Sequence, residues 1–106
     1  MPRTETIESF AEKVPTEFKE DVKKAIYILK DTGCKEVYIF GSLAKGEATK
    51  KSDIDLAIRN YPVKKFFHIY GKLYMELAHS VDLVDLDMDA YLGDYLEKEG
   101  GLVRVL

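Results

Sequence analysis

The sequence predicts a small α/β (α+β) domain in which helices pack on a mixed β-sheet. Three observations predict it: a helical apolar pattern near the N-terminus, short strand-like runs in the middle, and further helical segments between them. Strands interspersed with helices are typical of layered sheet-and-helix domains. The chain has 106 residues, a length that suits one domain. We therefore expect residues 1–106 to form a single domain.

The first helix is expected from Pro15 or Thr16 to Thr32. Its apolar residues recur every three or four positions and would form one buried face: Phe18, Val22, Ala25, Ile26 and Leu29. Pro15 suits the first turn and Thr16 could cap it. Gly33 is placed to end the helix.

Two strands are expected next. Residues 37–40 are continuously apolar and stop at Gly41, which is typical of a central strand covered on both faces. Residues 53–58 alternate between two sets, Asp53, Asp55 and Ala57 against Ile54, Leu56 and Ile58. The alternation predicts a strand with one face in the core and the carboxylates held on the other.

The C-terminal half predicts a helix over 63–78, a strand over 81–86 and a last helix over about 90–98. Residues 102–106 could form an edge strand. The helix over 63–78 carries a wide apolar stripe: Phe66, Ile69, Tyr70, Leu73, Tyr74 and Leu77. We interpret the stripe as a core face packed on the sheet, and its excess width leaves a partner chain or a homo-oligomer as alternatives.

Composition excludes several classes of protein. Hydrophobic residues make up 46% and charged residues 33%, which excludes intrinsic disorder. Sixteen Lys and Arg against nineteen Asp and Glu give a net charge of −3, so strong binding to duplex nucleic acid is not expected. No apolar run approaches the roughly 18–20 residues that cross a bilayer, and the polar start resembles no targeting segment. A single cysteine, Cys34, predicts a reduced, cytoplasmic protein.

Asp53 and Asp55 are the first candidates for chemistry. Side chains two apart on a strand share a face, so both carboxylates should meet there. Two like charges that close raise each other's pKa unless a cation lies between them. Mg²⁺, which prefers oxygen ligands, is the natural occupant. The alternative is a solvated acidic face at the start of a strand.

A third carboxylate is expected from the strand over 81–86. Asp82 and Asp85 are three apart, so a regular strand points them to opposite faces. Asp82, inside the strand, is favoured to join the first pair, whereas Asp85 and Asp87 are expected at the surface. Three carboxylates on adjacent strands could hold two Mg²⁺ ions about 4 Å apart, which suits nucleotidyl displacement.

Gly41-Ser42 is a candidate phosphate-binding turn. A strand ends on glycine, a hydroxyl residue follows and a short helical turn is expected to begin, so backbone N–H groups could approach an oxyanion. Gly46 would permit a second sharp turn. Taken alone, the Gly-Ser pair also fits an ordinary turn or helix cap.

The combination resembles the signature of the DNA polymerase β-like nucleotidyltransferase superfamily: Gly41-Ser42, ten further residues, then Asp53-Ile54-Asp55. The short chain and the later Val81-Asp82-Leu83-Val84 resemble its minimal nucleotidyltransferase branch. Members of that branch are MntA-like antitoxins, the small partners of HEPN proteins in prokaryotic toxin–antitoxin pairs. The core motif region spans 37–86. The resemblance implies the polymerase β-like nucleotidyltransferase fold.

The resemblance also implies roles for the matching acidic residues. Asp53 and Asp55 would bind the Mg²⁺ on the nucleotide side and share the catalytic ion. Asp82 would complete the catalytic site near the attacking hydroxyl.

Nucleotide binding is implied for Gly41 and Ser42, which would hold the triphosphate. Many members carry Arg directly after the Gly-Ser pair, and Leu43 stands there in this chain. Phosphate contacts could then fall to Lys45, or nucleotide binding could be weaker.

We therefore expect a Mg²⁺-dependent nucleotidyltransferase that moves a nucleoside monophosphate, in the favoured case AMP from ATP, to a hydroxyl acceptor. The resemblance points to a tyrosine of a HEPN toxin, which would make the chain an antitoxin. The alternative is a non-catalytic antitoxin that neutralises its partner by binding. Other reactive side chains lack matching companions: His68 and His79 are expected on a helix surface, and Cys34 in packing.

Overall fold

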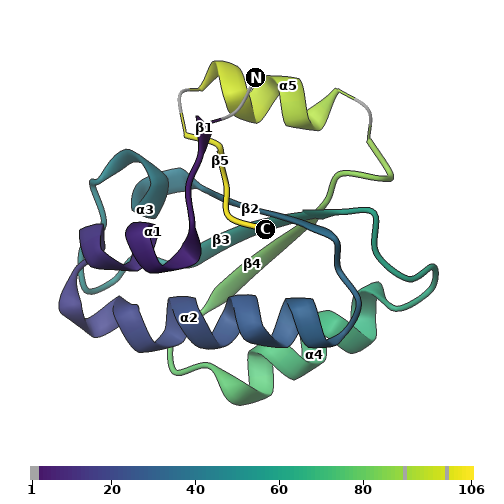
Figure 1. Ribbon diagram of the computed structural model, residues 1–106, viewed down its shortest axis with the longest axis horizontal. Helices are drawn as coiled ribbons and strands as arrows, with labels where there is room; N and C mark the ends of the chain where they lie inside the picture. Colours follow the sequence, from purple (N-terminus) through teal and green to yellow (C-terminus); the bar gives the residue numbers. More distant parts are fainter. Residues whose placement is uncertain (1–2, 90, 100) are drawn as a thin grey trace.

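The computed structural model describes residues 3–89, 91–99 and 101–106 (Figure 1). Five strands form one sheet in the order β1-β5-β2-β3-β4. Their bounds are β1 (Arg3–Thr4), β2 (Glu36–Phe40), β3 (Ile54–Arg59), β4 (Val81–Asp85) and β5 (Val103–Arg104). β2 runs antiparallel to β3 and β5, whereas β3–β4 and β1–β5 are parallel pairs. The predicted mixed sheet is confirmed.

Helices lie on both sides of this sheet. Their bounds are α1 (Ile7–Lys13), α2 (Thr16–Asp31), α3 (Gly41–Lys45), α4 (Phe66–Glu76) and α5 (Leu92–Lys98). Figure 1 shows α2 and α4 on one side of the sheet and α5 on the other. The main core lies on the side of α2 and α4, and Leu29, Ile39, Leu56 and Leu73 are completely buried in it. A smaller cluster of Tyr38, Ala57, Leu86 and Leu102 lies on the other face, with Leu92 and Leu96 of α5 packed against it.

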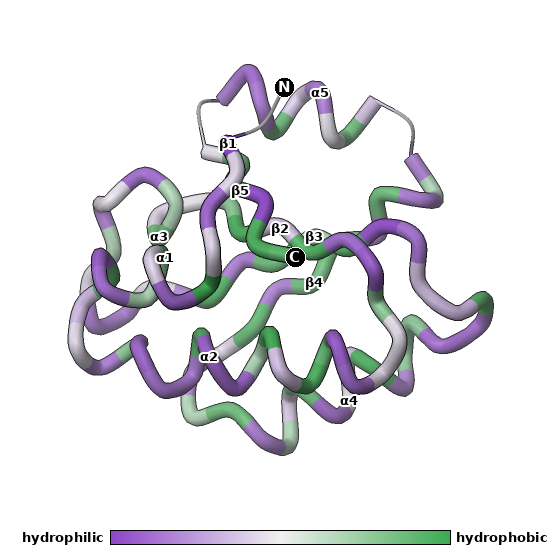
Figure 2. The backbone as a smooth tube through the Cα atoms, viewed as in Figure 1, coloured by the Kyte–Doolittle hydropathy of each residue, from purple (hydrophilic) through white to green (hydrophobic). Residues whose placement is uncertain are grey.

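α2 follows the prediction closely. Its apolar face is buried as expected, and green apolar segments alternate with purple polar ones along it in Figure 2. The expected Thr16 cap is wrong, because Pro15 occupies the N-cap position and no side chain caps the helix. Gly33, with φ of +97°, follows the helix end as predicted.

α4 is shorter than the predicted helix over 63–78. Lys64 has φ of +69°, in the left-handed region, so a continuous right-handed helix cannot pass through it. The helix starts at Phe66 and ends at Glu76, where Leu77 takes an extended conformation. The helix therefore begins at the first residue of the apolar stripe, three residues later than predicted, and Leu77 lies beyond its last turn.

The strands match the predictions in place but differ at their ends. Asp53 precedes β3, which begins at Ile54. The C-terminal strand is not an edge strand: β5 lies between β1 and β2, and β1 and β4 form the two edges. Ala90 and Gly100 lie outside the described residues, so the start of the last predicted helix is defined only from Leu92.

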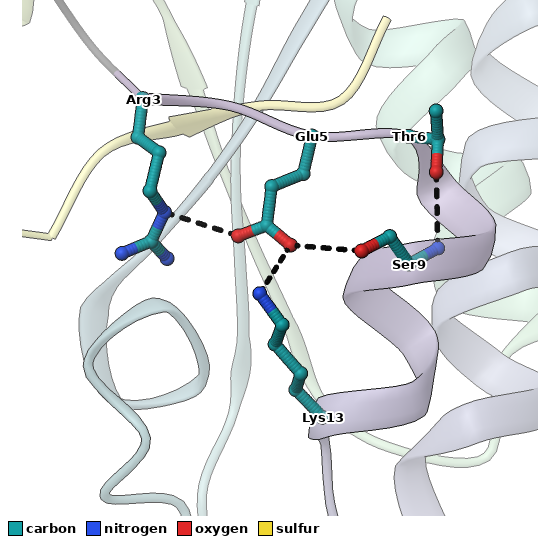
Figure 3. A network of polar contacts seen from close by, with 5 residues as sticks. All are labelled: Arg3, Glu5, Thr6, Ser9 and Lys13. Carbon is teal, nitrogen blue, oxygen red and sulfur yellow. Dashed lines mark hydrogen bonds and ion pairs between the residues drawn. The ribbon is translucent and has the colours of Figure 1, made fainter.

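The first fourteen residues contain two elements that the sequence analysis did not assign, β1 and α1. Thr6 caps α1, since its hydroxyl accepts a hydrogen bond from the Ser9 backbone N–H at 3.0 Å. Glu5 anchors the segment: its Oε1 accepts from Lys13 Nζ at 2.8 Å, and its Oε2 lies 3.0 Å from Arg3 Nε (Figure 3). Glu5 N–H also donates to the Arg104 carbonyl at 2.9 Å. This segment thus fastens β1 to β5.

The longest helix, α2, has 16 residues. Across the described ranges, no helix combines the length and apolar character needed to span a membrane.

Candidate active site

The pairing of β3 with β4 brings two of the predicted carboxylates together. Asp55 lies directly opposite Asp82 in the parallel register, and side chains at paired positions share a face. Asp85 pairs with Ile58 and therefore points to the opposite face, as the spacing predicts. There it accepts a hydrogen bond from the Tyr61 hydroxyl. The choice of Asp82 over Asp85 as the neighbour of Asp55 is consistent with this register.

The pKa of Asp55 indicates that Asp53 and Asp82 each lie near enough to act on its carboxyl electrostatically. Burial is the largest cause that raises its pKa, and the negative charges of Asp82 and Asp53 raise it further, to about 6. Asp55 is half-buried, whereas Asp53 and Asp82 are exposed. The carboxylates therefore repel one another, and a bound cation would reduce this repulsion.

Gly41 joins the phosphate-binding candidate to these carboxylates. Phe40, the last residue of β2, lies opposite Asp55 in the sheet. Gly41 follows with φ of +72°, and a Cβ atom on it would lie 2.1 Å from Asp55 Oδ2. That dihedral angle and that close approach both favour glycine at this position. The turn and the acidic pair therefore form one site.

α3 carries the rest of the predicted turn. It spans five residues after Phe40, and Gly46 ends it in the left-handed region with φ of +72°. Ser42 is half-buried in its first turn, and Leu43 is buried with its side chain in the main core. The residue after the Gly-Ser pair therefore packs inward and is not available to a ligand.

Lys45 is exposed at the end of α3, beside a small pocket of about 170 Å³. The pocket is lined by Phe40, Gly41, Lys45, Leu96, Glu99 and Gly101. A Cβ atom on Gly101 would lie 3.0 Å from Lys45 Cε. The C-terminal segment after α5 therefore lies against Lys45, and α5 and residue 101 form one wall of this pocket.

The donor set suits a hard cation. Asp53, Asp55 and Asp82 offer carboxylate oxygens only, the ligands that Mg²⁺ prefers. Among residues 3–89, 91–99 and 101–106, however, no group of three or more His, Cys, Asp or Glu side chains is arranged to hold a metal ion. Asp53 and Asp82 therefore act on Asp55 electrostatically, but the three side chains are not arranged as a preformed metal site.

Two expectations outside the site are wrong. His79 is not a helix-surface residue: it lies in the connection between α4 and β4, part-buried against Asp21 of α2. Asp85 is half-buried and bonded to Tyr61 rather than free at the surface. Asp21 and His79 are 58 positions apart, so no local pattern could have paired them. Cys34 is buried in the main core, in agreement with a packing role.

Comparison with known proteins identifies the family of this chain. Residues 23–103 match the family described as Polymerase beta, Nucleotidyltransferase. The chain belongs to this nucleotidyltransferase family. The match includes the Gly41 turn and all three acidic residues and ends at Val103, the first residue of β5. The resemblance found in the sequence is therefore confirmed, and the domain is a nucleotidyltransferase domain.

Two curated relatives come from Methanocaldococcus jannaschii, and both carry provisional names as protein adenylyltransferases. One is 40% identical over 76 residues, which are 68% of this nucleotidyltransferase and 78% of the relative. The other is 37% identical over 78 residues, with the same two coverages.

Three solved structures of similar shape come from toxin–antitoxin complexes. A toxin–antitoxin crystal structure with AMP-PNP aligns at a TM-score of 0.60 and 27% identity, over 82% of this chain and 70% of that one. A variant of the MntA–HpeT complex with two aspartates, two positions apart, replaced by glutamate aligns at 0.58 and 26% identity, over 74% and 68%. Another variant of that complex, with one tyrosine replaced by alanine, aligns at 0.56 and 30% identity, over 74% and 67%. The polymerase β-like fold is confirmed.

Proposed function

We propose that this nucleotidyltransferase moves AMP from ATP, with Mg²⁺, onto a tyrosine hydroxyl of a HEPN toxin partner and so acts as its antitoxin. One observation carries the proposal: Gly41 is packed against Asp55, which lies in register with Asp82. That arrangement places a turn able to approach phosphate directly beside an acidic pair. The family match, and relatives named as protein adenylyltransferases, support transfer to a protein.

Asp53, Asp55 and Asp82 would hold the metal. Bound Mg²⁺ supplies charge neutralisation on the phosphates and alignment of the acceptor for in-line displacement. The Asp55 carboxyl, with its pKa raised to about 6, is mostly ionised at pH 7.5 and able to bind a cation. Asp82 is exposed, so an acceptor on another chain can approach it.

The turn would hold the triphosphate through its backbone. Gly41 lets the chain pass close to Asp55, and Ser42 follows with its hydroxyl in the first turn of α3. Lys45 is the cation on α3 and would offset phosphate charge, since Leu43 is buried. In the reaction, the acceptor oxygen bonds to the α-phosphorus, the bond from that phosphorus to the bridging oxygen breaks, and pyrophosphate leaves. The acceptor proton passes to solvent or to a carboxylate of the site.

A partner chain would supply the acceptor. Three similar solved chains come from toxin–antitoxin complexes: one holds AMP-PNP, and two are variants that alter a pair of aspartates or a tyrosine. These features support a toxin as partner and a tyrosine as acceptor.

Neutralisation by binding alone is the second candidate, favoured by the recovery of similar chains in complex with their toxins. In that case the carboxylates would be dispensable for suppressing the toxin. Transfer and binding therefore differ in whether protection requires Asp55.

Intact-mass spectrometry of a co-expressed HEPN partner, incubated with this protein, ATP and Mg²⁺, tests the proposal. We expect an added mass of one or more AMP groups with the native chain and none with Asp55→Asn. Asp85→Asn is the matched control, because it removes a carboxylate from the opposite face of β4. No added mass on a partner that still binds stably would favour the non-catalytic antitoxin.

A further inference from the structure

A buried aspartate on α2 holds the segment that leads to Asp82. Asp21 is 7% exposed, and one of its oxygens accepts two hydrogen bonds from His79. The backbone N–H of His79 donates to Asp21 Oδ2 at 2.8 Å, and ring Nδ1 lies 2.7 Å from the same oxygen. Because an ionised carboxylate only accepts hydrogen bonds, Nδ1 carries a proton. The His79 ring also stacks on Phe18, with ring centroids 4.1 Å apart.

The residues after His79 are tied to the two neighbouring elements. The Ser80 carbonyl accepts the Ile54 N–H at 2.8 Å, and the Val81 carbonyl accepts the Tyr70 hydroxyl at 3.0 Å. Ile54 lies between Asp53 and Asp55. The connection over 79–81 therefore sets where β4 begins relative to the acidic end of β3, and Asp82 is the next residue.

Stability alone does not account for Asp21. It lies on the buried face of α2 among Phe18, Val22 and Ala25, where an apolar residue would pack without desolvating a charge. Burial raises the pKa of Asp21, but hydrogen bonds from His79 and Ala78 outweigh it and bring the pKa below its ordinary value. A buried carboxylate satisfied in this way fixes one geometry at some cost in stability. The geometry that it fixes is the entry to β4.

We propose that Asp21 is a positioning residue for Asp82, acting through His79 and the connection over 79–81 to keep Asp82 in register with Asp55. The inference rests on the proposed function, since the part that Asp82 takes in transfer belongs to it. Asp21 itself lies on the face of the sheet opposite the carboxylate site and touches no reacting group.

Three variants separate positioning from general stability. Asp21→Ala removes the carboxylate that accepts the hydrogen bonds from His79 and Ala78. His79→Asn keeps the backbone donor and offers an amide N–H near the position of Nδ1. Val22→Ala, one residue along α2, removes buried atoms and leaves the pair intact, so it is the matched control. Asp21→Asn, which keeps the shape and an acceptor oxygen, replaces Asp21→Ala if that protein does not fold.

The first readout is amide hydrogen exchange in the metal-free protein. We expect exchange at Ile54, whose N–H donates to Ser80, to be about tenfold or more faster in Asp21→Ala than in Val22→Ala, because only the first variant frees the connection. His79→Asn should stay within about threefold of the native chain. Equal exchange in Asp21→Ala and Val22→Ala would overturn the inference.

The second readout is AMP transfer to the partner. We expect Asp21→Ala to lower kcat by about tenfold to a hundredfold, as small misplacements of catalytic groups do, with KM for ATP changed less than threefold. Val22→Ala should retain the native kcat. A kcat loss that is equal in both variants would overturn positioning. If the native chain transfers nothing, the proposed function fails, and the exchange result alone then decides whether Asp21 keeps Asp82 in register.

Discussion

Replacement of Asp55 by asparagine should stabilise the metal-free protein while abolishing its activity. The pKa of this carboxyl is raised from 3.8 to about 6 by burial, Asp82 and Asp53. Each pKa unit corresponds to about 1.4 kcal/mol, so ionised Asp55 costs the folded state at most about 3 kcal/mol at pH 7.5. Solvent at the half-buried carboxyl reduces this cost, and we expect a measured gain of about 1–2 kcal/mol for Asp55→Asn.

The stabilising effect of Asp55→Asn depends on pH. Because the folded-state pKa is raised, the folded protein binds more protons than the unfolded chain between about pH 4 and 6. Native stability should therefore rise as pH falls from 7.5 through 6, and the advantage of Asp55→Asn should shrink toward zero near pH 4. Above pH 7 the advantage should be constant, since Asp55 is then ionised in both states.

Urea unfolding in the presence of EDTA, at pH 7.5 and pH 4.5, measures both effects. Asp85→Asn is the control, because that carboxylate lies on the opposite face of β4 and is bonded to Tyr61. The reasoning would be refuted if Asp55→Asn were less stable than the native chain at pH 7.5, or if its gain were the same at both pH values. Stabilisation joined to loss of AMP transfer is the pattern expected of a residue kept for function.

Three further predictions follow from the described contacts. Gly41→Ala should destabilise the protein by about 1–3 kcal/mol and abolish AMP transfer, because its Cβ would lie 2.1 Å from Asp55 Oδ2 at φ of +72°. Thermal unfolding and the mass assay measure the two effects, and a variant with native stability and native transfer would contradict the prediction. Thr6→Ala should cost about 1 kcal/mol through loss of the α1 cap, with Thr4→Ala as the exposed control in urea unfolding. The hydrogen bond from Lys13 keeps the pKa of Glu5 below its ordinary value, so Glu5→Gln should be less stable by about 1 kcal/mol at pH 7. That deficit should vanish as pH falls through the folded-state pKa; a deficit that persists in acid would point to packing instead.

Much of the fold could be predicted because its elements have local signatures. The three- and four-residue spacing in α2 and the continuous apolar run of β2 follow from the periods of helix and strand. Element ends were harder to predict. Lys64 takes a left-handed conformation that its residue type does not signal, and this moves the start of α4 to Phe66.

The sequence pattern also predicted most of the candidate site. The spacing of Gly41-Ser42 and Asp53-Ile54-Asp55 identified the family. The three-residue offset between Asp82 and Asp85 showed that only one of them could share a face with Asp55, and the place of Asp82 inside the strand favoured it, in agreement with the register. The predicted strand started at Asp53, whereas β3 begins at Ile54. The alternation of polar and apolar residues includes Asp53, but alternation alone does not show where pairing with a neighbouring strand begins.

By itself, the sequence determined most of the elements after residue 15, the acidic signature and the family, because each depends on spacings of a few residues that the backbone geometry converts directly into faces. Only the tertiary structure decided which distant segments meet. It placed β5 inside the sheet, brought Gly41 against Asp55, and paired Asp21 with His79 across 58 positions. Such contacts depend on how strands pair and how helices pack on them, and no local pattern carries that information.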